Sequence, residues 1–182
     1  MNSLRYNQHI ADIIRSGGIG VGPTDTIYGI LALANNQTAV ERVYELKGRN
    51  SSKPCIVLID KPEQLSEYGV EDIYAQKAKP YWPAPITLVL PTISAPDYLS
   101  RGQDSLAFRM PDSTSLRKLI RATGPLIAPS ANPEGELPAL SVKQAKAYFA
   151  DRVDFYVGSN HPIQASASTI LKLYGDNVEQ LR

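Results

Sequence analysis

The feature that most constrains the fold is an alternation of short apolar runs with segments of helical periodicity. Glycine, proline or polar residues bound the apolar runs, as expected of buried strands. These runs are 19–22, 55–59, 86–90, 106–110, 126–128, 155–157 and 169–171. Helical patterns lie at 10–14, 37–46, 115–122 and 142–149. The sequence therefore predicts a single α/β domain over residues 1–182, a twisted mixed parallel/antiparallel sheet flanked by helices.

Two details of this pattern remain open or depend on capping. Residues 28–34 are apolar throughout, so periodicity allows either a strand or a buried helix. The helix that starts at Gln37 has Asn36 or Thr38 as its N-cap and should end at Gly48. Pro62 predicts the start of a further helical stretch.

Composition is that of an ordinary globular protein. Of the 182 residues 43% are hydrophobic and 20% charged, and the net charge is +1, so any binding of anions has to be local. No apolar stretch is long enough to cross a membrane, and the N-terminus lacks the apolar core of a signal peptide, which predicts a cytoplasmic protein. The single cysteine, Cys55, excludes an internal disulfide and a cysteine-built metal site.

Several common catalytic motifs are missing from the sequence. The chain has no G-x-x-x-x-G-K-S/T loop, and the glycines at 17, 18, 20 and 22 do not fit G-x-G-x-x-G. There is no H-E-x-x-H, and His9 and His161 lie far apart, so no metal site is expected. A bound nucleotide would therefore contact side chains rather than a glycine-rich cradle.

A cationic segment follows the helix that begins at Gln37. Lys47, Arg49 and Lys53 are basic, and residues 47–59 include no acid. These cations either complement the negative end of the helix or bind successive phosphate groups. Spacing alone leaves both interpretations open.

Polar residues at strand ends carry a similar ambiguity. Ser130 and Asn132 follow a buried strand and form either a turn or a site for phosphate or ribose. The residues 24–26 form either an Asx or ST turn or a set of hydroxyls that bind an amino acid. Arg109 follows an apolar strand directly, so its charge either pairs with a carboxylate or reaches into a cleft.

Taken in order, these segments resemble the YrdC/TsaC family, the threonylcarbamoyl-AMP synthases of tRNA modification. The matching segments and the family patterns P-T-D/E-T-x-Y-G, K-x-R, W-P-G-P followed by an apolar strand, V-R-x-P and P-S-A-N are, respectively, Pro23–Gly29, Lys47–Arg49, Trp82–Pro91, Phe108–Pro111 and Pro129–Asn132. The resemblance is collinear from Gly18 to Arg182. It departs at Ala84, where the family has glycine, at Lys53, and at 165–169 before the family's S-T pair.

The resemblance implies a set of site residues. Those around L-threonine would be Thr26, Arg109, Ser130 and Ser168, and those on ATP would be Lys47, Arg49, Lys53, Ser105, Asn132 and Arg182. The greatest catalytic weight falls on Lys47, Arg49, Ser130 and Asn132. No protein metal site is implied, and Mg²⁺ would arrive with ATP. The chain resembles the minimal type of the family, without the additional C-terminal domain of longer relatives.

The implied reaction makes threonylcarbamoyl-AMP and pyrophosphate. Threonine's amine takes up CO₂ from bicarbonate, and the resulting carbamate attacks the α-phosphorus of ATP. The expected partners are ATP, L-threonine, bicarbonate and the tRNA-modification proteins that use the product, with weak tRNA binding as a further expectation. The alternatives are a paralogue with other carbamoyl-adenylate chemistry and an RNA-binding module, against which the near-neutral charge argues.

Overall fold

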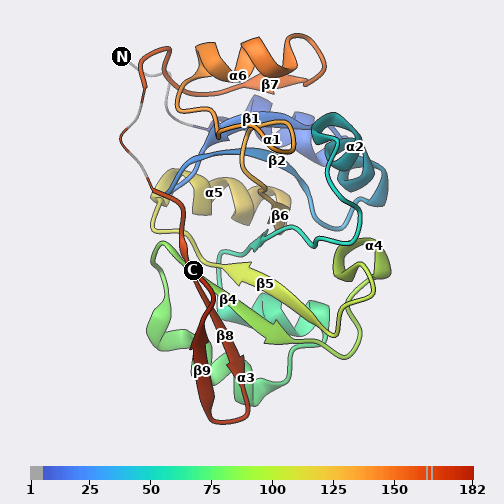
Figure 1. Cartoon of the computed structure of the whole chain (residues 1–182), viewed down its shortest axis with the longest axis vertical. Coiled ribbons are helices and arrows are strands. Elements are labelled where there is room, and N and C mark those ends of the chain that lie inside the picture. Colours follow the sequence, from blue (N-terminus) through green and yellow to red (C-terminus); the bar gives the residue numbers. More distant parts are fainter. Residues whose placement is uncertain (1–5, 163, 165) are drawn as a thin grey trace.

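The computed structural model describes residues 6–162, 164 and 166–182. Within these residues nine strands form one mixed sheet in the order β7-β1-β2-β6-β3-β5-β4-β8-β9. Parallel pairs (β1 with β7, β3 with β5, β4 with β8) alternate with antiparallel ones. The sheet is strongly twisted, because β1 and β2 run at a steep angle to β8 and β9 (Figure 1). The predicted fold class is confirmed.

The element bounds follow the predicted alternation closely. The strands are β1 (Gly20–Pro23), β2 (Tyr28–Leu33), β3 (Val57–Leu58), β4 (Ile86–Pro91), β5 (Ser105–Arg109), β6 (Leu126–Ile127), β7 (Phe155–Tyr156), β8 (Thr169–Tyr174) and β9 (Asn177–Gln180). The helices are α1 (Gln8–Arg15), α2 (Gln37–Lys47), α3 (Asp72–Ala78), α4 (Asp97–Ser100), α5 (Thr114–Thr123) and α6 (Val142–Phe149), with 3-10 segments at Pro62–Tyr68 and Lys79–Tyr81.

Side-chain caps fix where helix α2 begins and ends. The Asn36 side chain accepts the Ala39 N–H at 3.0 Å, which selects Asn36 over Thr38 as the N-cap. Gly48 closes the helix with a φ of 60°, in the left-handed region that glycine adopts without strain. The helix therefore releases the chain at Arg49 in a fixed direction, toward the cationic loop.

The central strands are covered on both faces, which resolves the ambiguity at 28–34. That segment is strand β2, paired with β1 and β6. Its alternate residues Ile30 and Leu31 belong to different hydrophobic clusters, one on each face of the sheet. Helices α1 and α5 contribute to the cluster that contains Leu31, and α2 and α6 to the other. Burial of both faces explains why the segment is apolar throughout.

The β8–β9 hairpin extends the sheet beyond β4 and brings the C-terminus back toward the middle of the molecule (Figure 1). Strand β8 was predicted, and β9 was not. Gly175 at the turn has a φ of 54°. Among the helices that the described residues form, none is long and apolar enough to cross a membrane.

Candidate active site

A cavity of about 410 Å³ lies where the inner turns of the sheet meet the C-terminal segment. Its walls come from the β1–β2 turn, the segment after α2, strands β4 and β5, the segment after β6, and the chain's last residues. The polar side chains that line it are Thr24, Thr26, Tyr28, Arg49, Arg109, Ser130, Ser168 and Arg182. Segments far apart in the sequence thus form one site of a size typical for small ligands.

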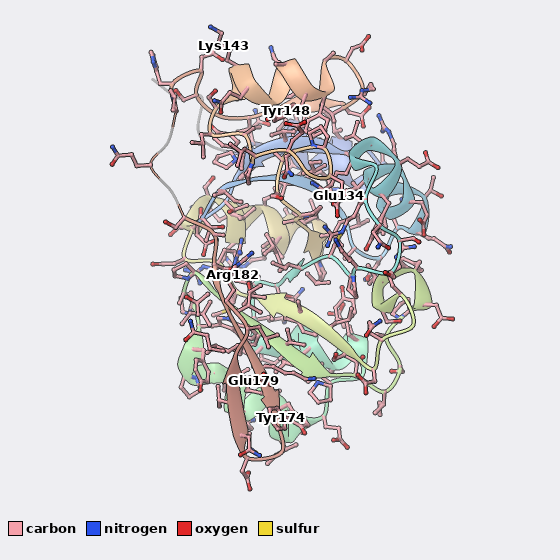
Figure 2. All side chains as sticks on the ribbon, in the orientation of Figure 1. Glu134, Lys143, Tyr148, Tyr174, Glu179 and Arg182 are labelled. Atoms are coloured by element: carbon pink, nitrogen blue, oxygen red, sulfur yellow. The ribbon has the colours of Figure 1, made fainter. Side chains whose placement is uncertain are left out.

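The charge of this cavity has one sign. Arg49, Arg109 and Arg182 line it, and none of the described lining residues is acidic. Figure 2 shows Arg182 near the middle of the molecule, between the β1–β2 layer and the β4–β5 layer. Arginine presents a planar set of donors that matches carboxylate and phosphate oxygens. The cavity is therefore suited to an anion.

Arg109 satisfies both interpretations that the sequence left open. Its side chain is 4% exposed and forms an ion pair with Asp25, Nη2 to Oδ1 at 3.2 Å, yet it also lines the cavity. Burial lowers the pKa of Arg109, while the Asp25 carboxylate raises it. Its Nε has no hydrogen-bond partner among the described residues. A buried guanidinium with a donor to spare, facing a cavity, can bind an anionic ligand.

The turn between β1 and β2 is fastened by hydroxyl groups. Thr24 Oγ1 lies 2.7 Å from the Ile27 carbonyl and accepts the Thr26 N–H at 3.0 Å, and its separation from Thr26 Oγ1 is 2.8 Å. Asp25 Oδ2 accepts the Asp112 N–H at 3.0 Å. The turn predicted from these residue types is confirmed. It also presents Thr24 and Thr26 to the cavity and Asp25 to Arg109.

Lys47 lies beneath the segment that holds Ser130 and Asn132. Its side chain is buried, and Nζ donates to the Ser130 carbonyl at 2.6 Å and the Asn132 carbonyl at 2.5 Å. Burial, together with the positive charge of Arg49, lowers the pKa of Lys47 to about 8. Strand β2 holds the same segment from the other side, through Ala131 N–H to the Tyr28 carbonyl at 2.9 Å. Lys47 is therefore placed to fix the position of Ser130.

Asn132 is also occupied within its own loop. Its Nδ2 donates to the carbonyls of Pro133 and Glu136, both at 2.8 Å. Neither Asn132 nor Lys47 is among the residues that line the cavity. Their predicted contacts with ATP stay predictions, and the contacts that the structure gives them are with the loop.

Arg49 and Lys53 share one acidic neighbour. Arg49 donates to the carbonyls of Lys53 and Pro54, at 3.1 and 3.0 Å, and its Nη1 lies 3.9 Å from a Glu134 oxygen. Lys53 Nζ lies 3.0 Å from the other Glu134 oxygen. Arg49 lines the cavity, whereas Lys53 is more exposed and lies outside the lining. Sequence reasoning missed Glu134, although an acid directly after the 130–133 turn was a visible signal.

Ser168 and Arg182 form the wall contributed by the C-terminal segment. Ser168 is buried, with Oγ 2.8 Å from Thr87 Oγ1 in β4. Arg182 Nε donates to the Ser168 carbonyl at 3.1 Å, so the two predicted residues lie side by side. Ser105 lies at the opposite end of β5 from Arg109 and does not line the cavity.

The fold and the cavity together define an α/β protein with a cationic small-molecule cleft. The model of the Sua5/YciO/YrdC family, described as "Telomere recombination", matches residues 12–182, and the chain belongs to this family. Threonylcarbamoyl-AMP synthase of Marinobacter nauticus is 34% identical over 146 residues, which are 78% of this chain and 77% of that protein. The synthase of Pyrococcus abyssi is 34% identical over 167 residues, 90% of this chain, but the chain spans only 49% of its length.

Solved structures match over nearly the whole chain. Pyrococcus abyssi Sua5 in complex with L-threonine has a TM-score of 0.84 and 33% identity, and the match covers 94% of this chain and 52% of that one. Escherichia coli YciO has a TM-score of 0.82 at 21% identity, covering 96% of this chain and 86% of that one, which supports the fold. The family predicted from the sequence is confirmed.

Proposed function

We propose that this chain is an L-threonylcarbamoyladenylate synthase, which makes threonylcarbamoyl-AMP and pyrophosphate from L-threonine, bicarbonate and ATP. The observation that carries the proposal is a cavity lined by three arginines and several hydroxyl groups, with no acid among its described lining residues. Both substrates of the proposed reaction carry anionic groups. The names of the relatives and the L-threonine complex of Pyrococcus abyssi Sua5 support the same activity.

Threonine would occupy the part of the cavity next to Arg109. The guanidinium would bind the amino-acid carboxylate, because it is buried, held by Asp25 and has an unpartnered Nε. Thr26, Ser130 and Ser168 line the same cavity and offer hydroxyl groups to the amino acid's polar atoms. Since these hydroxyls carry no charge, they would orient threonine without competing for the arginine.

The phosphates of ATP would lie toward Arg49 and Arg182. The threonine carbamate attacks the α-phosphorus, its oxygen–phosphorus bond forms, and the bond to the leaving pyrophosphate breaks. This reaction needs no side-chain nucleophile, so the protein's contribution would be positioning and neutralisation of charge. Lys47 would act on Ser130 and Asn132 through the contacts it makes with their loop.

Mg²⁺ would enter as the companion of the ATP phosphates. Magnesium prefers phosphate and carboxylate oxygens, and the arginine-rich cavity fits the phosphates better than a bare cation. The product would pass to tRNA-modification proteins in the cytoplasm, and weak tRNA binding at the cationic surface is part of the proposal.

Turnover with defined substrates tests this function. Purified protein is incubated with ATP, Mg²⁺ and bicarbonate together with each amino acid in turn, and pyrophosphate is measured. Pyrophosphate formed with threonine supports the synthase, and pyrophosphate formed with another carbamoyl donor indicates a paralogue. RNA binding that weakens steeply with salt, without turnover, would indicate an RNA-binding module.

A further inference from the structure

The cations of the loop after α2 are already engaged by the protein's own oxygens. Two carbonyl groups hold the Lys47 ammonium, and two others hold Nε and Nη2 of Arg49. The remaining terminal nitrogen of Arg49 and the ammonium of Lys53 point to one carboxylate, that of Glu134. A phosphate group that approaches Arg49 or Lys53 therefore meets a negative charge already in place.

The position of Glu134 is set by the loop that carries Ser130 and Asn132. Its N–H donates to the Lys47 carbonyl at 2.7 Å, which ties the residue to the end of α2, and it lies beside that helix (Figure 2). The hydrogen bond from Lys53, with further help from the charges of Arg49 and Lys47, lowers the pKa of the Glu134 carboxyl. The carboxylate therefore stays ionised at neutral pH.

We propose that Glu134 is an internal counter-ion, which competes with polyphosphate for Arg49 and Lys53 and so sets the affinity of the site. The proposal rests on the proposed function, in that it takes the cationic loop to be where nucleotide phosphates bind. Binding of ATP displaces the carboxylate from Arg49. After the reaction the carboxylate returns to the arginine and favours release of pyrophosphate.

Glutamine at position 134 provides a direct test, because it keeps the size of the side chain and removes its charge. The matched control is Glu136→Gln, two residues further on, where the side chain is exposed and forms no ion pair among the described residues. Calorimetric titration gives the Kd of sodium pyrophosphate without Mg²⁺ and of ATP with Mg²⁺ for each protein. Melting temperatures verify that each variant is folded.

We expect Glu134→Gln to bind both ligands about threefold to tenfold more tightly, because an exposed ion pair contributes about as much as one such factor. The Kd of the Glu136→Gln control should change by less than about twofold, since loss of one unpaired surface charge is largely screened. Glu134→Asp, whose carboxylate cannot reach both cations, should fall between the wild type and Glu134→Gln. Pyrophosphate release should become slower in Glu134→Gln.

Two results would overturn the role of Glu134 while leaving the synthase intact. An unchanged Kd would show that the carboxylate does not compete, and weaker binding would mean that Glu134 supports the loop or contacts Mg²⁺. If neither ligand binds to any of the proteins, the phosphate site itself is wrong, and the proposed function fails together with this inference. Tighter pyrophosphate binding without turnover would support the counter-ion and refute only the synthase.

Discussion

Replacement of Lys47 by methionine separates loop support from direct phosphate binding. Methionine is similar in length to lysine and apolar, so the variant removes the ammonium without opening a large cavity. The two short bonds to the Ser130 and Asn132 carbonyls come from a charged donor, and such bonds are worth about 1.5–3 kcal/mol each, or about 3–6 kcal/mol together. Loss of these bonds is the destabilising part of the change.

Removal of a buried charge offsets part of that loss. The pKa of Lys47 is lowered from 10.5 to about 8. That difference corresponds to about 3 kcal/mol of unfavourable burial, which methionine does not carry. The expected net loss in the free energy of unfolding is therefore about 0–3 kcal/mol. The variant should fold, while its 130–132 segment is no longer fixed.

Steady-state kinetics then distinguish the two roles. If Lys47 fixes the loop, kcat/KM should fall at least about tenfold for both threonine and ATP, because small displacements of reacting groups are costly. Lys143→Met on the exposed side of α6 is the control and should keep the wild-type values. A rise in the KM for ATP alone, with threonine unaffected, would refute the loop role and assign Lys47 to the phosphates.

Three further predictions concern the arginines and pH. Arg49→Ala should lower turnover at least about tenfold, because a charge-assisted phosphate contact is worth about 1.5–3 kcal/mol; unchanged activity per folded molecule would leave Arg49 a loop residue only. Arg109→Lys keeps the charge but loses the planar fork, so the KM for threonine should rise far more than that for ATP, and an equal rise for both would make Arg109 a structural partner of Asp25. Raising the pH through about 8 should reduce turnover as the Lys47 ammonium loses its proton, a limb that Lys47→Met should lack. Between about pH 8 and 10.5 the unfolded chain binds more protons at this residue, so urea unfolding should show wild-type stability rising relative to Lys47→Met.

Much of the fold could be predicted because the local signals agree with the final structure. Asn36, Gly48 and the apolar runs state where elements begin and end. Strand β9 escaped prediction because all of its residues are exposed, so it lacks the alternation that marks a half-buried strand. The order of the strands depends on contacts between distant segments, such as β1 with β7, which local patterns do not record.

The candidate site was predicted less completely, since spacing gives residue types but not directions. Lys47 and Arg49 look equivalent in the sequence, yet one side chain turns into the protein and the other lines the cavity. For Arg109 the sequence offered an ion pair or a cleft, and the structure has both at once. Glu134 approaches the cations only because the 130–136 loop folds back over the end of α2.

Pyrophosphate release is the most direct test of the central claim that this site makes threonylcarbamoyl-AMP. With ATP and Mg²⁺ present, release should require threonine and bicarbonate together, because the carbamate formed from them is the nucleophile. The nucleotide product should be threonylcarbamoyl-AMP, identified by mass spectrometry. Equal release of pyrophosphate in the absence of threonine or of bicarbonate, or formation of ADP and phosphate instead, would contradict the account.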